Sequence, residues 1–274
     1  LSQELGTPIN SISDAEKRIK DERYSRFDSM INTKFTDIVL LQLLDDFEKR
    51  NDAQIQEIVT DNADIPTIFE YILGIIWYKT SQCKGDILEY MKLSLDSNLL
   101  PRTHASGGEA DIVYHYEATK VYPMHSLLLE ATLANQNNQR RMEMEPVSRH
   151  LGQHLLNYGN MNSYCIFVTN DLNINVIADF RGRKHIPFYD VNDTSKYINS
   201  MKIIPLQTAE LKEIIKRHTT YEELYPIFDR AYKSNQPPNV WYDINVIQPI
   251  VNDSIIYDFE KTTGLKIAED NKNN

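Results

Sequence analysis

Apolar residues recur at helical spacing through the first third of the chain. A charged segment opened by Ser11 or Ser13 carries its apolar residues on roughly one face, and a leucine-rich segment follows with Thr36 suited to the N-cap. The most apolar segment begins at Pro66, a residue that a first helical turn tolerates. The sequence therefore predicts helices over 11–35, 36–50, 52–59, 66–80 and 84–97.

Strand-type runs occupy the middle of the chain. Two of them span 112–117 and 125–133, and a third, strongly apolar, spans 162–169. Pro146 cannot lie deep in a helix without losing a hydrogen bond, so we expect a helix from there to about Tyr158. That helix would be the crossover between two neighbouring parallel strands.

The rest of the pattern completes an α/β architecture. A strand over 201–206 precedes a helix capped at Thr208, a helix beginning near Thr220 and an apolar run over 241–259. The core is expected to be a mixed sheet flanked by helices. The predicted organisation is a helical linker or N-terminal subdomain over 1–62, the α/β core over 63–218 and a C-terminal helical extension over 219–274.

An acid inside the second strand-type run is the strongest chemical signal. Glu130 follows three consecutive leucines, and an ionised carboxylate in such a setting is costly unless a cation or donor pairs with it. Asp111 opens the first run, so in adjacent antiparallel strands the two acids would lie side by side. Carboxylate oxygens suit Mg²⁺, which activates water and neutralises a phosphate under attack. The alternatives are a turn-forming Asp111 after Gly-Gly and an exposed strand face at Glu130.

The residues around these acids carry a family pattern. Asp, a spacer and Glu-x-Lys form a nuclease motif, but Thr132 stands here in place of the lysine. Gln139, Glu143 and His150 follow Glu130 at nine, thirteen and twenty residues, the last within the run Val147-Ser148-Arg149-His150-Leu151. The segment resembles the AlwI family of type IIS restriction endonucleases and the related site-specific nicking endonucleases.

The resemblance implies a restriction-endonuclease-like nuclease core over 63–218 that hydrolyses DNA phosphodiesters with Mg²⁺, for which Mn²⁺ can substitute. It also implies that a glutamate on the helix before the sheet, here Glu70, reaches the site. With no lysine present, water activation rests on the metal and Glu143. The implied metal ligands are Asp111, Glu130, the Ala131 carbonyl oxygen and Glu143, with Glu70, His150 and Gln139 as further catalytic residues.

Three of these assignments have alternatives. Related chains often place the first acid thirteen residues before the Glu, where Glu117 stands; we assign Asp111 because an Asp-Ile strand opening matches the family pattern. Glu143 could instead be an anion near a helix N-terminus, although Glu145 fits that place better. Glu70 could close a capping box with Thr67.

The net charge of −10 is unusual for a protein that binds DNA. Site acids that a metal partly cancels account for some of it. The resemblance accounts for the rest, since that family recognises DNA through a separate N-terminal domain, which we expect to precede this chain. The best local candidates for phosphate contacts are Arg181, Arg183, Lys184 and His185, unless they form only a solvated loop.

Other classes of protein are excluded or left as rivals. The chain has no apolar run of membrane-spanning length and no secretory signal, and two cysteines are too few for a disulfide framework or a thiolate zinc site. We expect a cytoplasmic protein whose partners are double-stranded DNA, the recognition domain and a second catalytic subunit or transient homodimer. Rivals are a nuclease of DNA repair or transposition and a non-catalytic nuclease-like DNA-binding module. The recognition sequence, the cut offset and the choice between nicking and double-strand cleavage stay open.

Overall fold

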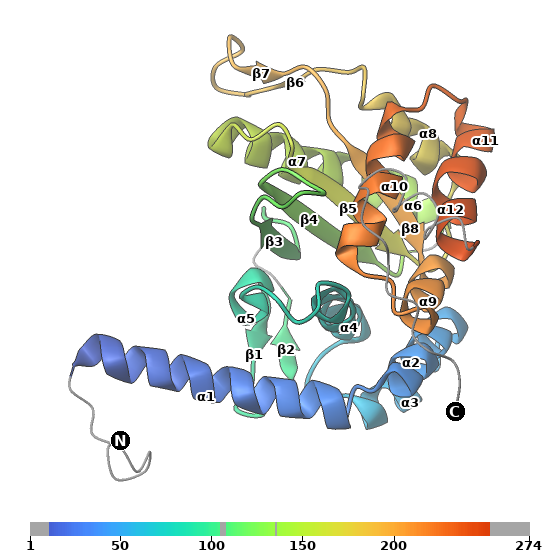
Figure 1. Ribbon diagram of the computed structural model, residues 1–274. Coiled ribbons are helices and arrows are strands. Elements are labelled where there is room, and N and C mark those ends of the chain that lie inside the picture. The colour runs from blue at the N-terminus through green and yellow to red at the C-terminus, as the bar shows by residue number, and fades with distance from the viewer. Residues whose placement is uncertain (1–10, 105–107, 135, 253–274) are drawn as a thin grey trace.

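A four-stranded mixed sheet forms the centre of the molecule (Figure 1). The computed structural model describes residues 11–104, 108–134 and 136–252. In the sheet β3 and β4 are antiparallel, whereas β4, β5 and β8 are parallel to one another. The strands, in their order across the sheet, are β3 (Ile112–Tyr116), β4 (His125–Thr132), β5 (Tyr164–Thr169) and β8 (Ile203–Gln207).

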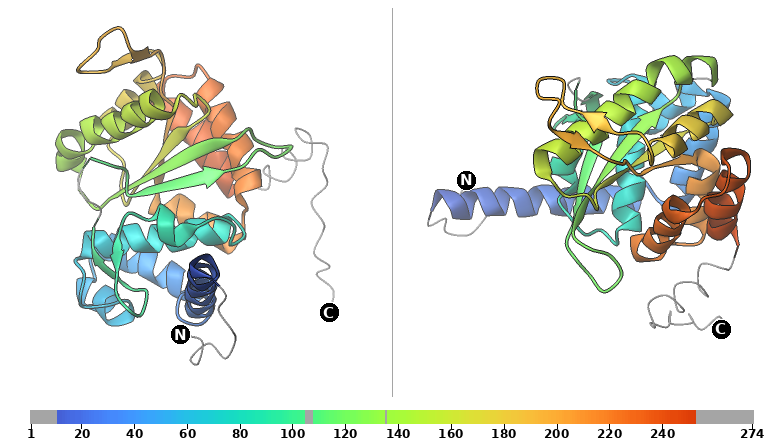
Figure 2. Two further views of the ribbon diagram at one scale, coloured as in Figure 1. Left: turned by 90° about the vertical axis from the view of Figure 1, so that its left-hand side faces the viewer. Right: turned by 90° about the horizontal axis from the view of Figure 1, so that it is seen from above.

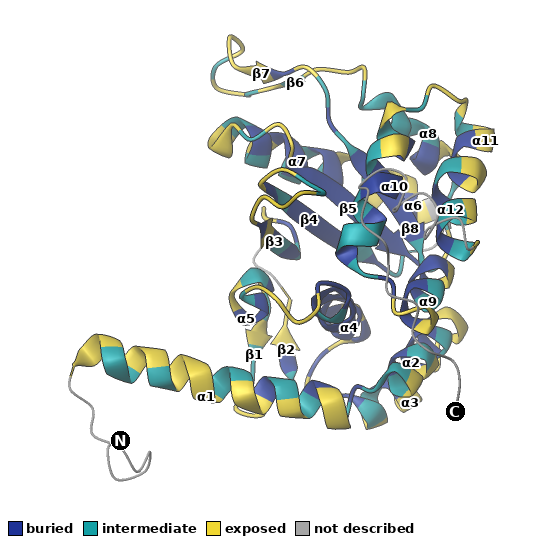
Figure 3. Ribbon diagram, viewed as in Figure 1, coloured by how far each residue is buried: buried dark blue, intermediate teal, exposed yellow. Residues whose placement is uncertain are grey.

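Helices cover both faces of this sheet (Figure 2). On one face lies α4 (Ile65–Thr80), which is buried almost all round, as Figure 3 shows. On the other lies α7 (Met144–Tyr158), which with α6 (Gln136–Met142) forms the crossover from β4 to β5. The predicted parallel βαβ unit is thereby confirmed. Because both faces are covered, β4 and β5 read as apolar runs rather than as alternating patterns.

The N-terminal helices lie below α4 in Figure 1. They are α1 (Ile12–Thr33), α2 (Asp37–Lys49) and α3 (Asp52–Ile58). Ser11, rather than the alternative Ser13, caps α1, and Thr36 caps α2 as the sequence predicts. Their buried residues belong to one hydrophobic cluster that extends from Phe27 to Ile250. Residues from all three predicted ranges of the chain therefore share a core.

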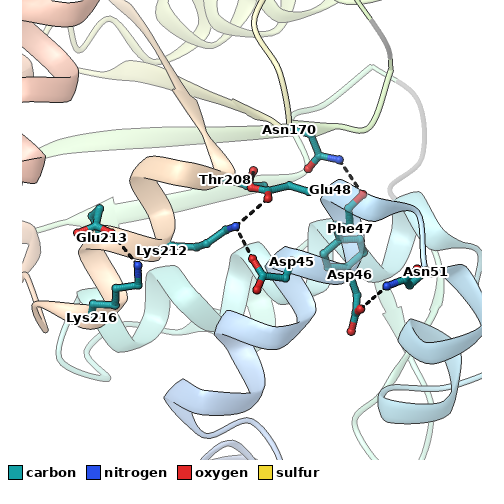
Figure 4. A network of polar contacts seen from close by, with 10 residues as sticks. All are labelled: Asp45, Asp46, Phe47, Glu48, Asn51, Asn170, Thr208, Lys212, Glu213 and Lys216. Carbon is teal, nitrogen blue, oxygen red and sulfur yellow. Dashed lines mark hydrogen bonds and ion pairs between the residues drawn. The ribbon is translucent and has the colours of Figure 1, made fainter.

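A polar network joins α2 to the parallel strands (Figure 4). Lys212, from α9 (Thr208–Lys216), contacts Asp45 and lies 2.7 Å from Glu48. Glu48 also accepts a hydrogen bond of 2.6 Å from the hydroxyl of Thr208. These contacts fix the N-terminal helices against the end of β8, where α9 begins.

The C-terminal helices pack beside α8 (Ile174–Gly182) and α9. Thr220 and Glu223 form a capping box at the start of α10. This confirms the helix that the sequence predicts to begin near Thr220. After Pro237 and Pro238 the chain stays helical to residue 251, and residues 253–259 of the apolar run lie outside the described residues. These elements are α10 (Tyr221–Lys233), α11 (Pro238–Tyr242), η1 (Asp243–Ile247) and α12 (Gln248–Val251).

The structure corrects three local predictions. The helix expected over 84–97 is only α5 (Ile87–Tyr90), after which β1 (Ser94–Leu95) pairs with β2 (Pro101–Thr103). Its helical pattern is overridden because Met91 bridges to Ile112 and Lys92 bonds to the Asp111 carbonyl. The N-cap of α9 is Gln207 rather than Thr208. A hairpin of β6 (Phe188–Tyr189) and β7 (Tyr197–Ile198), absent from the prediction, projects beyond α7 in Figure 1. None of the described helices combines the length and apolarity that a membrane crossing requires.

Candidate active site

The register of the β3–β4 hairpin brings Asp111 and Glu130 together. Ile112 pairs with Leu129, so Asp111, one residue earlier, falls opposite Glu130. Oδ2 of Asp111 accepts a hydrogen bond of 2.8 Å from the backbone N–H of Ala131. Glu117 follows the other end of β3 and is exposed, about 20 Å from Asp111 at ~3.3 Å per strand residue. The geometry favours Asp111 over Glu117 as the first acid.

Four carboxyl groups interact electrostatically at this end of the hairpin. Glu70 comes from α4 and Glu143 from the residue before α7. Burial raises the pKa of Glu130 to about 8, with a further contribution from Glu143. Burial and then Asp111 raise the pKa of Glu70 to about 9, while burial and then Glu130 raise the pKa of Asp111. The cluster therefore resists holding four negative charges without a cation.

Thr132 holds Glu143 in this cluster. Its hydroxyl donates a hydrogen bond of 2.7 Å to Oε1 of Glu143. Burial raises the pKa of Glu143, and this hydrogen bond opposes the rise. Glu143 stands at the N-cap position of α7 but makes no capping hydrogen bond with its side chain. The residue in the place of the motif's lysine thus positions an acid, a role that sequence reasoning missed although Thr132 and Glu130 share a strand face by alternation.

The capping box proposed for Thr67 and Glu70 is wrong. Asp64 caps α4 by accepting a hydrogen bond of 2.9 Å from the backbone N–H of Thr67. Glu70 lies one turn further, 8% exposed, and its Oε2 is buried without a hydrogen-bond partner among the described residues. Of the two interpretations left open by the sequence, the structure supports the one that places Glu70 at the acidic cluster.

The two supporting residues expected from the sequence have different surroundings. Nδ1 of His150 lies 2.7 Å from Oε1 of Glu130, and burial lowers the pKa of this imidazole. A neutral imidazole protonated at Nδ1 donates to the carboxyl group. Gln139 is fully buried and bonds to Thr169, the Asp171 carbonyl and the Asn173 N–H. It ties α6 to the segment after β5, and its hydrogen bonds within the described residues do not involve the four carboxyl groups.

The basic segment at the end of α8 is largely used in packing. Arg181 lies 4.9 Å from the ring of Trp241 and donates to the carbonyl groups of Tyr232 and Ser234. Lys184 donates to the carbonyl of Lys233 at 3.3 Å. Arg183 pairs with Asp179 on its own helix, while His185 is exposed. The structure therefore assigns Arg181 and Lys184 to the contact between α8 and the end of α10 rather than to a free phosphate-binding loop.

The donor set at the acidic cluster suits a hard divalent cation. Carboxylate oxygens are the ligands that Mg²⁺ prefers, and Oε2 of Glu70 is an orphaned buried acceptor. Among the described residues, no Lys or Arg forms an ion pair with any of the four carboxyl groups. Within those same residues, no three or more His, Cys, Asp or Glu side chains lie close enough together to coordinate a metal ion as they stand. Binding would require the carboxyl groups to draw together.

A comparison with models of known protein families identifies the family of this chain. The model of the AlwI restriction endonuclease matches residues 2–214. The chain belongs to this family. The match contains all four carboxyl groups and ends within α9, so the AlwI-family region excludes α10, α11 and α12. As a member of this restriction endonuclease family, the chain is a nuclease of the restriction type.

Comparison with solved structures supports the fold. The small subunit, R.BspD6I2, of the heterodimeric restriction endonuclease R.BspD6I is similar at 17% sequence identity with a TM-score of 0.51. The similarity covers 81% of this chain and 98% of that subunit. A comparison with curated protein sequences gave no match. The expected mixed sheet flanked by helices, with an N-terminal helical segment, is confirmed.

Proposed function

We propose that this AlwI-family chain is the metal-dependent cleavage domain of a type IIS restriction or nicking endonuclease that hydrolyses DNA phosphodiesters. The observation that carries the proposal is the convergence of Glu70, Asp111, Glu130 and Glu143 without a cationic ion-pair partner among the described residues. Such a set stores unfavourable electrostatic energy that a divalent cation relieves. Mg²⁺ is the proposed ion, with Mn²⁺ as a substitute.

The residues would divide the work as follows. A bound metal ion supplies neutralisation of phosphate charge and activation of the attacking water. Asp111 and Glu130 are the proposed ligands, together with the Ala131 carbonyl oxygen; the Ala131 N–H fixes Oδ2 of Asp111. Thr132 engages Oε1 of Glu143, so Oε2 of Glu143 is the proposed acceptor for the water proton. His150 orients Glu130.

The proposed partners are a second catalytic subunit, double-stranded DNA and a recognition domain. A single acidic cluster attacks one strand at a time, so cutting both strands requires a second catalytic subunit or a transient homodimer. One solved protein of similar fold is the small subunit of a heterodimeric restriction endonuclease, which supports the proposal of a partner subunit here as well. Double-stranded DNA is the proposed substrate, and a separate domain N-terminal to this chain is the proposed source of sequence recognition.

Plasmid cleavage with three matched carboxyl variants tests the proposal. Asp111→Asn and Glu130→Gln remove one charge each from the cluster, whereas Glu117→Gln removes one at the far end of β3. We expect Mg²⁺-dependent cutting by the parent and by Glu117→Gln, and loss of about 100-fold or more in the other two. Nicked or linear product shows how many strands are cut.

Metal binding gives an independent measurement. Titration calorimetry with Mg²⁺ is expected to detect binding to the parent and to Glu117→Gln, and weakened binding to Glu130→Gln. Full cutting by Glu130→Gln would exclude the proposed role of this residue. A folded parent that neither binds Mg²⁺ nor cuts DNA would instead indicate a non-catalytic nuclease-like module.

A further inference from the structure

A groove of about 260 Å³ lies between α7 and β3, beginning at the acidic cluster. One wall is a stripe on α7 formed by His150, Gln153, His154 and Asn157, which share a face because they are three or four residues apart. Val113 and Leu128 form its apolar floor. Since His150 bonds to Glu130, the groove is continuous with the proposed site of cleavage.

The walls of the groove are rich in hydrogen-bond donors. Gln153 and Asn157 are exposed, and neither side chain forms a hydrogen bond within the described part of the chain. Nε2 of His154 is buried without a partner among the same residues. Across the groove stand Lys92 and His115, the latter bonded through Nδ1 to Ser126 at 3.0 Å. This lining differs sharply from the acidic cluster beside it.

Among the described residues that line the groove, Glu109 is the only acid. Glu109 lies 3.9 Å from Lys92, and its side chain is 66% exposed. Burial, reinforced by His115, lowers the pKa of His154 to about 4, so this imidazole is neutral near pH 7. Neutral donors beside a single lysine bind an anion by hydrogen bonding more than by net charge.

We propose that this groove binds the phosphates of the DNA strand next to the bond that is cut. The proposal rests on the proposed function, because it identifies how the substrate is held beside the carboxyl groups. From His150 to Asn157 the stripe is about 10 Å long at ~1.5 Å per helical residue. That is the axial length of about three nucleotides at ~3.4 Å each. The groove thus supplies the phosphate contacts that the overall charge of −10 makes hard to place.

Charge substitution at one amide of the groove tests the inference. Gln153→Lys and Gln153→Glu are compared with Gln54→Lys and Gln54→Glu, since Gln54 is an exposed helical glutamine on α3. The chain carries Glu130→Gln throughout so that DNA stays uncut, and a short labelled duplex is titrated at several KCl concentrations. Each Gln153 variant is therefore compared with a Gln54 variant that carries the same added charge outside the groove.

The expected result is specific to the groove. Gln153→Lys should tighten binding and steepen the slope of log Kd against log salt by about 0.9, the value of one added phosphate contact. Gln153→Glu should weaken binding about tenfold, because a carboxylate repels the backbone. The two Gln54 variants should change binding much less. Equal effects at Gln153 and Gln54, or no binding of the duplex by the parent, would overturn the inference.

These outcomes separate the groove from the proposed chemistry. Cleavage by the unmutated chain, which retains Glu130, tests the nuclease proposal. Duplex binding by the chains that carry Glu130→Gln tests the groove. A parent that cuts DNA but shows no Gln153-specific change in binding leaves the nuclease standing and removes the groove. Binding that responds specifically to the Gln153 substitutions, together with an unmutated chain that does not cut DNA, would support the groove and count against the nuclease proposal.

Discussion

Nδ1 of His150 lies 2.7 Å from Oε1 of Glu130, which joins α7 to the central strand β4 at the acidic cluster. The two side chains are only about a tenth exposed. Because β4 is held on both sides by neighbouring strands, its acid is fixed in place by the sheet and oriented by the helix. A hydrogen bond to a ligating group tunes both its direction and its affinity for metal.

Replacing His150 by Ala should therefore lower cleavage by about 10–100-fold and raise the Mg²⁺ concentration that half-maximal cutting requires. His150→Asn, which retains a donor, should recover part of the loss. His185→Ala, at an exposed histidine, is the matched control. An unchanged Mg²⁺ requirement in His150→Ala would show that the imidazole does not position Glu130.

Glu70→Gln should stabilise the metal-free protein in a pH-dependent way. The pKa of Glu70 is raised from 4.5 to about 9, so its contribution to stability is complete below about pH 4.5 and is lost as pH rises toward 9. At pH 7 the loss amounts to about 3 kcal/mol at ~1.4 kcal/mol per pH unit. Denaturation in EDTA at pH 5 and pH 8 should show a larger advantage of the variant at pH 8.

The control for that measurement is Glu57→Gln, because Glu57 is exposed on α3. Its stability relative to the parent should not vary between the two pH values. Equal stability of the parent and Glu70→Gln at pH 8 would contradict the burial of a strained acid at this position.

Metal should have the opposite effect on the parent. Mg²⁺ at about 100 times its Kd should stabilise the folded state by about 2.7 kcal/mol, and EDTA should remove this gain. Glu130→Gln should gain much less from Mg²⁺. Thermal unfolding with and without Mg²⁺ measures both effects, and Glu117→Gln should behave as the parent does. A rise in Tm of the same size in Glu130→Gln would place the metal elsewhere.

His125 should make the fold sensitive to acid. It is 2% exposed, its Nδ1 donates a hydrogen bond of 2.7 Å to the Pro123 carbonyl, and in the neutral imidazole its Nε2 accepts one of 2.5 Å from the Tyr221 hydroxyl. Burial lowers its pKa from 6.5 to about 4, so the stability it confers is complete above about pH 6.5 and is lost as pH falls toward 4.

The size of this loss is about 3 kcal/mol across the 6.5 to 4 window, at ~1.4 kcal/mol per unit. His125→Gln should be less stable than the parent at pH 7, with a smaller difference at pH 4.5. Urea denaturation at the two pH values measures the difference. Parallel pH profiles for the two proteins would exclude His125 as the source of acid sensitivity.

Gly152→Ala should loosen the contact between α7 and the β6–β7 hairpin. A Cβ at Gly152 would lie 2.4 Å from the ring of Phe188, so the ring or the hairpin must move. Overpacking of this kind costs about 1–3 kcal/mol. Gly182→Ala is the control, because its Cβ would make an ordinary contact of 3.8 Å with Ile186.

Thermal unfolding measures the cost, and the double variant Gly152→Ala with Phe188→Ala identifies its origin. Removing the ring should recover part of the stability lost in Gly152→Ala. A Tm of Gly152→Ala that stays level with the parent or rises as much as that of Gly182→Ala would exclude the clash, because alanine by itself favours a helix over glycine.

The sequence by itself determined the elements that the core most needs. The apolar runs of β4 and β5 and the almost wholly apolar α4 appear in the sequence because burial on every side admits few polar residues. Glu130 stands out for the same reason, since an acid inside such a run has no local explanation. The residues from Glu130 to Leu151 also carried the resemblance to the AlwI family, to which the chain belongs.

Tertiary structure alone decided which distant residues meet. The capping signal at Thr67 and Glu70 was equally compatible with a local role, until the packing of α4 on the sheet placed Glu70 near Asp111. Thr132 acquired its contact with Glu143, and the predicted helix over 84–97 was shortened to α5 and followed by the strand β1, through contacts with other segments. Local patterns act over a few residues, whereas these contacts depend on how separate elements pack, and that packing is settled only by burying the whole core at once.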